Sequence, residues 1–266
     1  MQIPPDPEPD RPLACIEVGG GGIQTVLFDN GSEPRLVEGA QQPNGYALAF
    51  AVPGIIADGV VRLASNLGWR DTDPVQELRL AGPARLVVND AEAAALGEAA
   101  LRGDHGLKRL VYLCVGTGVG GAVVSNGEVI RANLFGHNAR GHGHEFGDLV
   151  CRCERRGCLE TVAAGWALPD PLTDRDIAAV GRRLAMAIGQ HELCGQGTVV
   201  IGGGIARRYP SLVERIASHL PSRDVEGSLA PPAAKSAAAW GLQHALGAGK
   251  EVGKEAAGEA SGEAMR

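Results

Sequence analysis

The chain lacks three features that would assign it to a membrane, to nucleic acid or to the secretory route. No apolar run approaches the roughly 20 residues that a membrane-spanning helix needs. No basic stripe offsets the net charge of −6, which argues against nucleic acid as the main partner. The N-terminal stretch MQIPPDPEPDRP lacks the basic-then-apolar order of a signal peptide. We therefore expect a cytoplasmic protein with reduced cysteines and with neither a membrane nor a nucleic-acid partner.

The composition is that of a soluble globular protein. A chain of 266 residues suits one large domain or two small lobes. The 44% hydrophobic and 21% charged content argues against a disordered chain, and the 39 glycines favour an α/β protein with many tight loops. Two segments are expected to be tails: the proline-rich, acidic residues 1–12 as a flexible tail, and the low-complexity residues 247–266 as a disordered one.

Three glycine turns each follow a short apolar run that predicts a strand. The strand–turn pairs are Leu13–Val18 with Gly19–Gly22, Leu110–Val115 with Gly116–Gly121, and Thr198–Ile201 with Gly202–Gly204. A single glycine turn is a common connection between elements and has no functional meaning by itself. Glycine also lets the backbone approach phosphate oxygens, however. Three turns of this kind favour nucleotide phosphate binding over plain turns. The first two also begin similar strand–turn–strand units, which indicates an internal duplication.

The remaining pattern alternates strands and helices. Further strands are predicted at Gln24–Asp29, Arg35–Glu38, Tyr46–Val52 and Arg85–Val88. Helices are predicted at Asp73–Leu80, Ala91–Leu101, Asp174–Gln190, Ser211–Leu220 and Lys235–Leu246. The seven or so residues between the third and fourth strands are too few for a crossover helix.

Asn89 and Asp90 stand where a predicted strand ends and a helix begins. The pair has a common structural interpretation as a helix cap. The alternative is a carboxylate at the mouth of a cleft that takes a proton from a substrate hydroxyl, the role of the base in phosphoryl transfer. The two residues alone do not decide between these interpretations.

The stretch 137–160, HNARGHGHEFGDLVCRCERRGCLE, concentrates chemistry-bearing side chains. Cys151, Cys153 and Cys158 lie within eight residues, and this spacing favours zinc over free thiols. A fourth ligand is needed, and the candidates are Asp148, His144 and His142. His137 lies at the start of the same stretch. Glu160 closes it and begins a predicted helix, so one interpretation of Glu160 is a charge that complements the helix N-terminus.

Taken together, these motifs resemble the ROK family of sugar kinases, which also contains repressors, within the actin-like ATPase fold. The resemblance covers roughly Leu13 to Leu246 and rests on the segments EVGGGG, VPGIIADGVV with NLGW, NDAEAAALGE, GTGVGGAVVSNGEVIRA, HEFGDL, CRCERRGCLE and VVIGGGI. It implies a two-lobed α/β fold of the ribonuclease H-like type, with duplicated mixed sheets and a central cleft. The expected lobes are residues 13–104 and 105–246, and the second carries the zinc loop 137–160.

The resemblance also implies an activity. It predicts an ATP-dependent, glucokinase-like phosphotransferase acting on a primary hydroxyl, of the 6-OH type, in a hexose or hexose-like molecule; an amino sugar and a cyclitol stay open. Asp90 matches the family's catalytic base. Family members use Mg²⁺ with ATP, carry structural Zn²⁺ and are commonly homodimers.

Site residues carry over position by position. Phosphate-motif matches are Gly19, Gly20, Gly21, Gly116, Thr117, Gly118, Gly202, Gly203 and Gly204. Sugar-contact matches are Asn66, Asn89, Asp90, Glu145 and Glu160, with Asp148 at the position of a histidine that binds zinc and touches the sugar. The zinc set implied is Cys151, Cys153, Cys158 and Asp148.

The sequence departs from the family pattern at the first phosphate motif and at the zinc loop. Glu17 replaces the usual Asp, and Gly21 and Gly22 replace the usual Thr and Lys, which removes a hydroxyl and a cation near the phosphates. Asp148 in place of histidine could attract a substrate ammonium. The alternative function is a non-catalytic, sugar-binding or regulatory protein of the same kind. A repressor is not expected, because only 12 residues precede Leu13.

Overall fold

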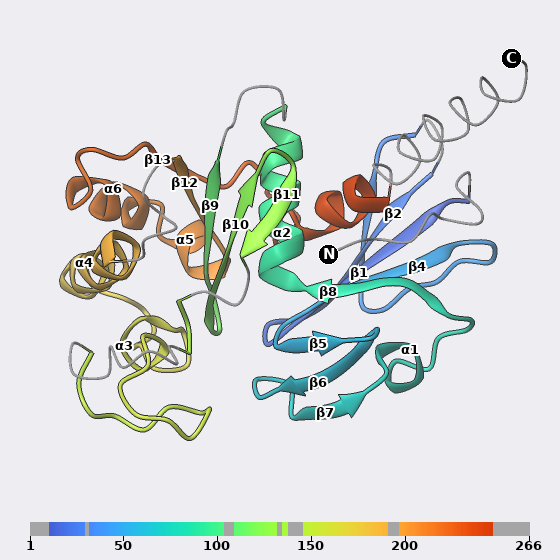
Figure 1. Ribbon diagram of the computed structural model, residues 1–266, viewed down its shortest axis with the longest axis horizontal. Helices are drawn as coiled ribbons and strands as arrows, with labels where there is room; N and C mark the ends of the chain where they lie inside the picture. The colour runs from blue at the N-terminus through green and yellow to red at the C-terminus, as the bar shows by residue number, and fades with distance from the viewer. Residues whose placement is uncertain are drawn as a thin grey trace, which may run out of the picture.

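A computed structural model of the chain contains two five-stranded sheets built to one plan (Figure 1). It describes residues 11–29, 32–103, 109–131, 135–137, 146–190 and 197–246. The first sheet has the order β3-β2-β1-β4-β8, with β1 (Leu13–Gly19), β2 (Gly22–Phe28), β3 (Arg35–Glu38), β4 (Ala47–Val52) and β8 (Ala84–Asn89). β1 pairs antiparallel with β2 and parallel with β4. β4 is buried along its whole length, as its unbroken apolar run requires.

The second sheet repeats this arrangement. Its order is β11-β10-β9-β12-β13, with β9 (Leu110–Val115), β10 (Val119–Ser125), β11 (Glu128–Arg131), β12 (Thr198–Gly202) and β13 (Val225–Gly227). β9 pairs antiparallel with β10 across a glycine turn and parallel with β12. Each sheet therefore starts with a strand, a glycine turn and an antiparallel strand, which confirms the duplicated unit predicted from the sequence.

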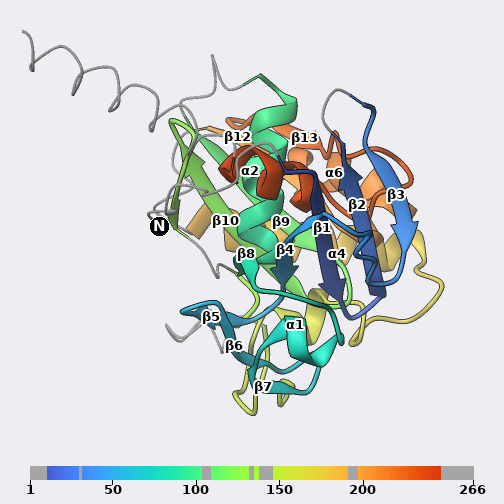
Figure 2. The ribbon, with the colours of Figure 1, turned by 90° about the vertical axis from the view of Figure 1, so that its right-hand side faces the viewer.

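Two helices lie between the sheets, where they share one core with both (Figures 1 and 2). They are α2 (Asp90–Leu101) and the helical segment 238–246. They cross at two glycines: a Cβ on Gly97 would lie 1.9 Å from the carbonyl oxygen of Ala237, and one on Gly241 1.8 Å from that of Ala93. Only glycine allows this approach, so α2 and the segment 238–246 pack closely against each other at these two positions.

The outer face of the second sheet is covered by helices, which form a separate core with it. α4 (Asp174–Gln190) packs against α6 (Ser211–Ser218), while α3 (Glu160–Ala163) and α5 (Gly204–Arg208) lie nearer the glycine turns. The apolar residues of α4 recur at helical spacing and are buried on one side. This segment was predicted correctly from its periodicity.

The outer face of the first sheet is covered differently. A three-stranded meander of β5 (Ile55–Ala57), β6 (Val60–Ala64) and β7 (Trp69–Thr72), with the short helix α1 (Pro74–Glu77), packs on it. The sequence analysis did not predict this meander, because its strands are short and three to five residues long. No helix occupies residues 39–45, as predicted from the short connection.

The helix predicted at Asp73–Leu80 is shorter than expected. Asp73 caps it by accepting from the N–H of Val75 at 2.8 Å, and the chain leaves the helix where Arg79 adopts a φ of 55°. Among the described residues, no helix combines the length and the apolar character that crossing a bilayer would require.

Candidate active site

The three predicted glycine turns come together at one place between the sheets. A Cβ on Gly20 would lie 2.7 Å from Cγ2 of Thr117, so the β1–β2 turn and the β9–β10 turn are in van der Waals contact. A Cβ on Gly116 would lie 3.7 Å from the amide nitrogen of Gly204, at the end of β12. Gly203 has a φ of 92°, and a Cβ there would clash with the carbonyl of Val115 at 2.5 Å. The contacts at Gly20 and Gly203 explain why glycine is needed at those two positions. The role of the three turns in binding phosphate stays a prediction.

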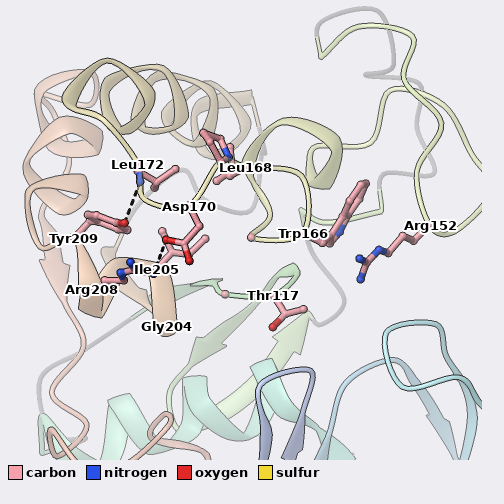
Figure 3. A pocket seen from close by; sticks show the side chains of 13 residues that line it. Thr117, Arg152, Trp166, Leu168, Asp170, Leu172, Gly204, Ile205, Arg208 and Tyr209 are labelled. Atoms are coloured by element: carbon pink, nitrogen blue, oxygen red, sulfur yellow. Dashed lines mark hydrogen bonds and ion pairs between the residues drawn. The ribbon is translucent and has the colours of Figure 1, made fainter.

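A pocket of about 470 Å³ opens beside the second and third turns (Figure 3). Gly116, Thr117 and Gly204 form one wall, and Trp166 and Tyr209 project from the segments on either side. It is lined by Gly116, Thr117, Arg152, Gly165, Trp166, Leu168, Pro169, Asp170, Leu172, Gly204, Ile205, Arg208 and Tyr209. The space has the apolar and aromatic lining with a few polar groups that is typical of a small-molecule site.

Several polar contacts fix the pocket wall. The Tyr209 hydroxyl accepts from the N–H of Leu172 at 3.0 Å, and Arg208 pairs with Asp170 at 2.7 Å. The Arg152 guanidinium lies 4.9 Å from the centre of the Trp166 ring. These side chains could not be predicted from the sequence, because they lie outside every glycine motif and carry no spacing signal.

Asp90 begins α2, where its neighbour Ala91 packs against β10: a Cβ on Gly120 would lie 3.7 Å from the Cβ of Ala91. The Oδ1 of Asp90 accepts from the N–H of Ala91 at 2.9 Å. Burial raises the pKa of Asp90 to about 6, although the backbone hydrogen bond opposes this shift. A carboxylate whose pKa lies near neutral pH is suited to act as a general base.

Glu17, near the end of β1, belongs to the same centre. Burial raises the pKa of Glu17 to about 7. A hydrogen bond with Ser236 and the charges of Lys235 and Arg207 oppose this shift, and the charge of Asp90 adds to it. No local sequence pattern connects residues 207, 235 and 236 with Glu17, since the fold alone brings these segments together.

Asn89 acts as the cap of α2. Its Oδ1 accepts from the N–H groups of Ala91 at 2.9 Å and Glu92 at 3.3 Å, and its Nδ2 donates to the carbonyl of Gly54 at 3.0 Å. The cap interpretation of Asn89 is therefore confirmed. Its contact with a sugar stays a prediction.

Glu160 and Asn66 meet at the second glycine turn, although they come from opposite halves of the chain. Glu160 is 2% exposed; its Oε1 accepts from the N–H of Val119 at 2.9 Å and its Oε2 from Nε1 of Trp166 at 3.1 Å. A Cβ on Gly118 would lie 2.5 Å from Glu160 Oε1 and 2.9 Å from Asn66 Nδ2. Asn66 Oδ1 is buried and has no hydrogen-bond partner among the residues that the structure describes. That orphaned acceptor is open to a hydroxyl donor.

Three cysteines and a histidine form a candidate metal centre. The ligand atoms of His137, Cys151, Cys153 and Cys158 all lie within 4.8 Å of one another. Cys151 Sγ lies 3.6 Å from His137 Nδ1, and Cys153 Sγ lies 3.6 Å from Cys158 Sγ. A tetrahedral zinc ion with bonds of about 2.0–2.3 Å separates its ligand atoms by roughly 3.3–3.8 Å. The donor set and its spacing therefore fit Zn²⁺.

The fourth ligand predicted from the sequence, Asp148, is not part of this cluster. Its carboxylate is 89% exposed and pairs with Arg156 at 3.6 Å, on the outside of the loop. His137 takes the place instead, because the chain folds back far enough to bring it against Cys151. His142, His144 and Glu145 lie outside the described residues.

The other ring nitrogen of His137 faces the predicted sugar side. Its Nε2 lies 3.7 Å from Oε2 of Glu160. Histidines that bind metal commonly donate their second N–H to a carboxylate, which fixes the orientation of the ring. His137 thus joins the candidate metal centre to Glu160, and through it to the second glycine turn.

Comparisons with known proteins agree with this geometry. The ROK family model matches residues 34–192. An N-acetylmannosamine kinase of Citrobacter koseri is 34% identical over 218 residues, which are 68% of this chain and 72% of that kinase. A glucokinase of Halalkalibacterium halodurans is 29% identical over 184 residues, which are 65% of this chain but only 54% of the glucokinase.

Among solved structures, a ROK hexokinase from Thermus thermophilus superimposes with a TM-score of 0.59 at 25% identity. The match covers 91% of this chain and 99% of the hexokinase. The duplicated sheets are those of the actin-like ATPase fold, which the structural relatives share. The chain therefore belongs to the ROK family, and its curated relatives are sugar kinases.

Proposed function

We propose that the chain is an ATP-dependent kinase that phosphorylates the primary, 6-type hydroxyl of a hexose or of a 2-acetamido hexose. The observation that carries this proposal is Asp90, a carboxylate with a pKa of about 6 at the start of α2, where Ala91 packs against Gly120. Membership of the ROK family supports ATP and a sugar as the two substrates. The relatives that act on glucose and on N-acetylmannosamine motivate the two sugar classes.

Each part of the site has a role in this proposal. The nucleotide occupies the pocket between Trp166 and Tyr209, with its phosphates directed past Thr117 toward the β1–β2 turn. Asp90 accepts the proton of the sugar hydroxyl, whose oxygen bonds to the γ-phosphorus while the bond to the β-phosphate oxygen breaks and ADP leaves. Glu160, Asn66 and Asn89 orient the sugar ring.

Two metal ions belong to the proposal. Mg²⁺, when bound with ATP, neutralises the phosphate charge, and Glu17 is the carboxylate at the first glycine turn that suits it. Zn²⁺ would be held by His137 and the three cysteines. Its effect on the reaction is indirect, because it holds His137 against Glu160.

The test is ADP release with a panel of sugars, measured on the wild type and on Asp90→Asn. We expect turnover to fall by about 10²- to 10⁴-fold in Asp90→Asn, the usual contribution of a general base. Sugar and ATP binding, followed by titration calorimetry, should survive. Asp58→Asn, at a side chain that is 91% exposed, is the matched control and should behave as the wild type. Sugar binding by the wild type without turnover of any sugar would instead identify a non-catalytic sugar-binding protein.

The sugar panel also tests the preference for a charged amino sugar that Asp148 suggested. In the structure the Asp148 carboxylate is paired with Arg156 and exposed, so it has no evident reason to select an ammonium. We expect glucosamine to be turned over no better than glucose. A clear preference for glucosamine that disappears in Asp148→Asn would restore the original hypothesis.

A further inference from the structure

The turn between β1 and β2 offers an anion backbone groups only. All four of its residues, Gly19–Gly22, are glycines. Glu17 lies two residues before the turn in the sequence, and its charge and that of Asp90 repel each other. A terminal phosphate brought to this place would meet two carboxylates, so its binding requires a cation from elsewhere.

Lys235 places an ammonium group at this turn. A Cβ on Gly22 would lie 3.4 Å from Lys235 Nζ, so the ammonium stands where a side chain at position 22 would begin. Nζ is buried, and within the described part of the chain it has neither a hydrogen-bond partner nor an ion pair within 4 Å. An ammonium has three N–H donors, and burying it without an acceptor costs free energy. The geometry indicates that its acceptor is a ligand.

The backbone around Lys235 is held by side chains of β2 and of α5. Gln24 of β2 accepts from the N–H of Lys235 at 2.8 Å and donates to the carbonyl of Ala233 at 3.0 Å. Arg207 of α5 donates to the carbonyl of Lys235 at 3.2 Å and also to that of Ala234. The main chain is therefore fixed without help from the Lys235 side chain, which is free to serve a ligand.

A structural ion pair with Glu17 is the alternative explanation of Lys235. The two charges do attract each other. However, Glu17 has its hydrogen bond with Ser236, and no contact within 4 Å joins Glu17 to Lys235. A lysine selected to neutralise Glu17 would be expected to touch it.

We propose that Lys235 binds the terminal phosphate of ATP at the β1–β2 turn and supplies, from the C-terminal segment, the positive charge that position 22 lacks. This role rests on the proposed kinase function. Thr117 lines the nucleotide pocket and also contacts Gly20 of the β1–β2 turn, which places the turn at the end of the triphosphate. Lys235 keeps its proton throughout and acts by charge and hydrogen bonding.

The test compares Lys235→Met and Lys235→Arg with the wild type by titration calorimetry. We expect Lys235→Met to bind ATP and inorganic tripolyphosphate about 10- to 100-fold more weakly, as befits the loss of a charge-assisted contact. AMP and sugar binding should not change, because neither reaches the turn. Lys235→Arg should recover much of the loss. Arg35→Met, which removes a cation that is 59% exposed on β3, is the matched control and should bind all ligands normally.

Thermal unfolding separates a ligand-binding role from a structural one. Lys235→Met removes an unpaired buried charge, so its Tm without ligand should equal or exceed that of the wild type. A Tm that falls by several degrees, with unchanged affinity for tripolyphosphate, would show that Lys235 serves the fold and would overturn the proposal.

The same data distinguish this proposal from the kinase function. ADP release by the wild type, with equal ATP affinity and KM in Lys235→Met, would keep the kinase and remove the role of Lys235. Tripolyphosphate binding that depends on Lys235, without ADP release from any sugar, would keep the anion site and remove the kinase.

Discussion

Asp90 and Glu17 titrate near neutral pH, because burial raises their pKa values to about 6 and about 7. Between about pH 4 and pH 7 the folded chain then holds more protons at these two carboxyls than the unfolded chain does. The free energy of unfolding therefore falls as the pH rises through this window. The proposed catalysis should have the opposite trend, since only an ionised Asp90 can accept a proton from the sugar hydroxyl.

This opposition yields a first prediction. Turnover at saturating substrates should rise from pH 5 to pH 7.5 with an apparent pKa near 6, while the Tm falls over the same range. Asp90→Asn should be more stable than the wild type at pH 7.5, by about 1–2 kcal/mol, and should match it near pH 4. Calorimetric scans at both pH values check this, with Asp58→Asn as control. A loss of stability in Asp90→Asn at pH 7.5 would contradict it.

Sequence patterns identified some residues of the site and could not identify others. Asp90 was predictable, because a strand end followed by a helix start is a local signal. The groups that shift the pKa of Glu17 could not be predicted, because Lys235 and Ser236 lie more than 200 residues away along the chain. Asp148 lies outside the Cys–His cluster for a related reason: spacing shows which ligand types are present, whereas folding decides which of them turns inward.

At the scale of elements, the zinc loop yields a second prediction. The purified protein should contain about one zinc per chain, and His137→Ala should lose most of it, because His137 completes the cluster. Asp148→Asn should keep its zinc, since that carboxylate lies outside the cluster. The zinc content of both variants, measured by mass spectrometry, decides whether His137 or Asp148 is the fourth ligand. Zinc loss in Asp148→Asn together with retention in His137→Ala would restore the assignment made from the sequence.

Chelation of this metal yields a third prediction. Removing zinc from the wild type should lower the Tm and raise the KM for the sugar more than the KM for ATP, because His137 contacts Glu160 on the proposed sugar side. Readdition of zinc should reverse both effects. Equal changes in the two KM values would indicate a general loss of structure rather than a local one.

The crossing of α2 with the segment 238–246 yields a fourth prediction. Gly97→Ala should destabilise the protein by about 1–3 kcal/mol or more, because the new Cβ would lie 1.9 Å from the Ala237 carbonyl. Gly189→Ala is a matched control within α4, where the new Cβ would meet Leu220 at an ordinary 3.8 Å. That variant should gain about 0.5–1 kcal/mol from helix propensity. Urea unfolding of both proteins measures the difference.

At the scale of the whole molecule, a buried ion cluster ties α2 to the second sheet. Glu98, with no exposed surface, accepts from Arg102, from Ser228 and from the N–H of Leu229 at 2.9 Å. Arg102 in turn pairs with Glu226 of β13 at 3.0 Å. Because the strands of both sheets contribute to one central core, the two halves should unfold together.

A fifth prediction follows for this cluster. Arg102→Met leaves the Glu98 charge buried without its partner and should cost about 3–5 kcal/mol. Arg62→Met removes exposed pairs with Asp58 and Asp71 and should cost about 0–1 kcal/mol. Scanning calorimetry should show a single transition in both variants. Two separate transitions would show that the lobes are thermodynamically independent.

The two duplicated sheets were more predictable from the sequence than the elements that pack on them. The segments LACIEVGGGG and LVYLCVGTGVGG each show an apolar strand followed by a glycine turn. This local pattern is enough to predict the duplicated sheets. The meander β5–β7 could not be predicted, because strands this short carry too little periodicity to stand out. The packing of α2 against the second sheet depends on contacts between distant segments, which no local pattern encodes.

The contact between Thr117 and Gly20 bears on how fast a nucleotide is captured. The Thr117 methyl group lies against that glycine. If the proposed triphosphate site extends between the two turns, we expect a phosphate to enter only after they part. The form that accepts ATP is then a fraction of the population, and the apparent Kd exceeds the intrinsic one by the inverse of that fraction. In stopped-flow mixing, the observed association rate would level off at high ATP, at a plateau set by the parting of the turns.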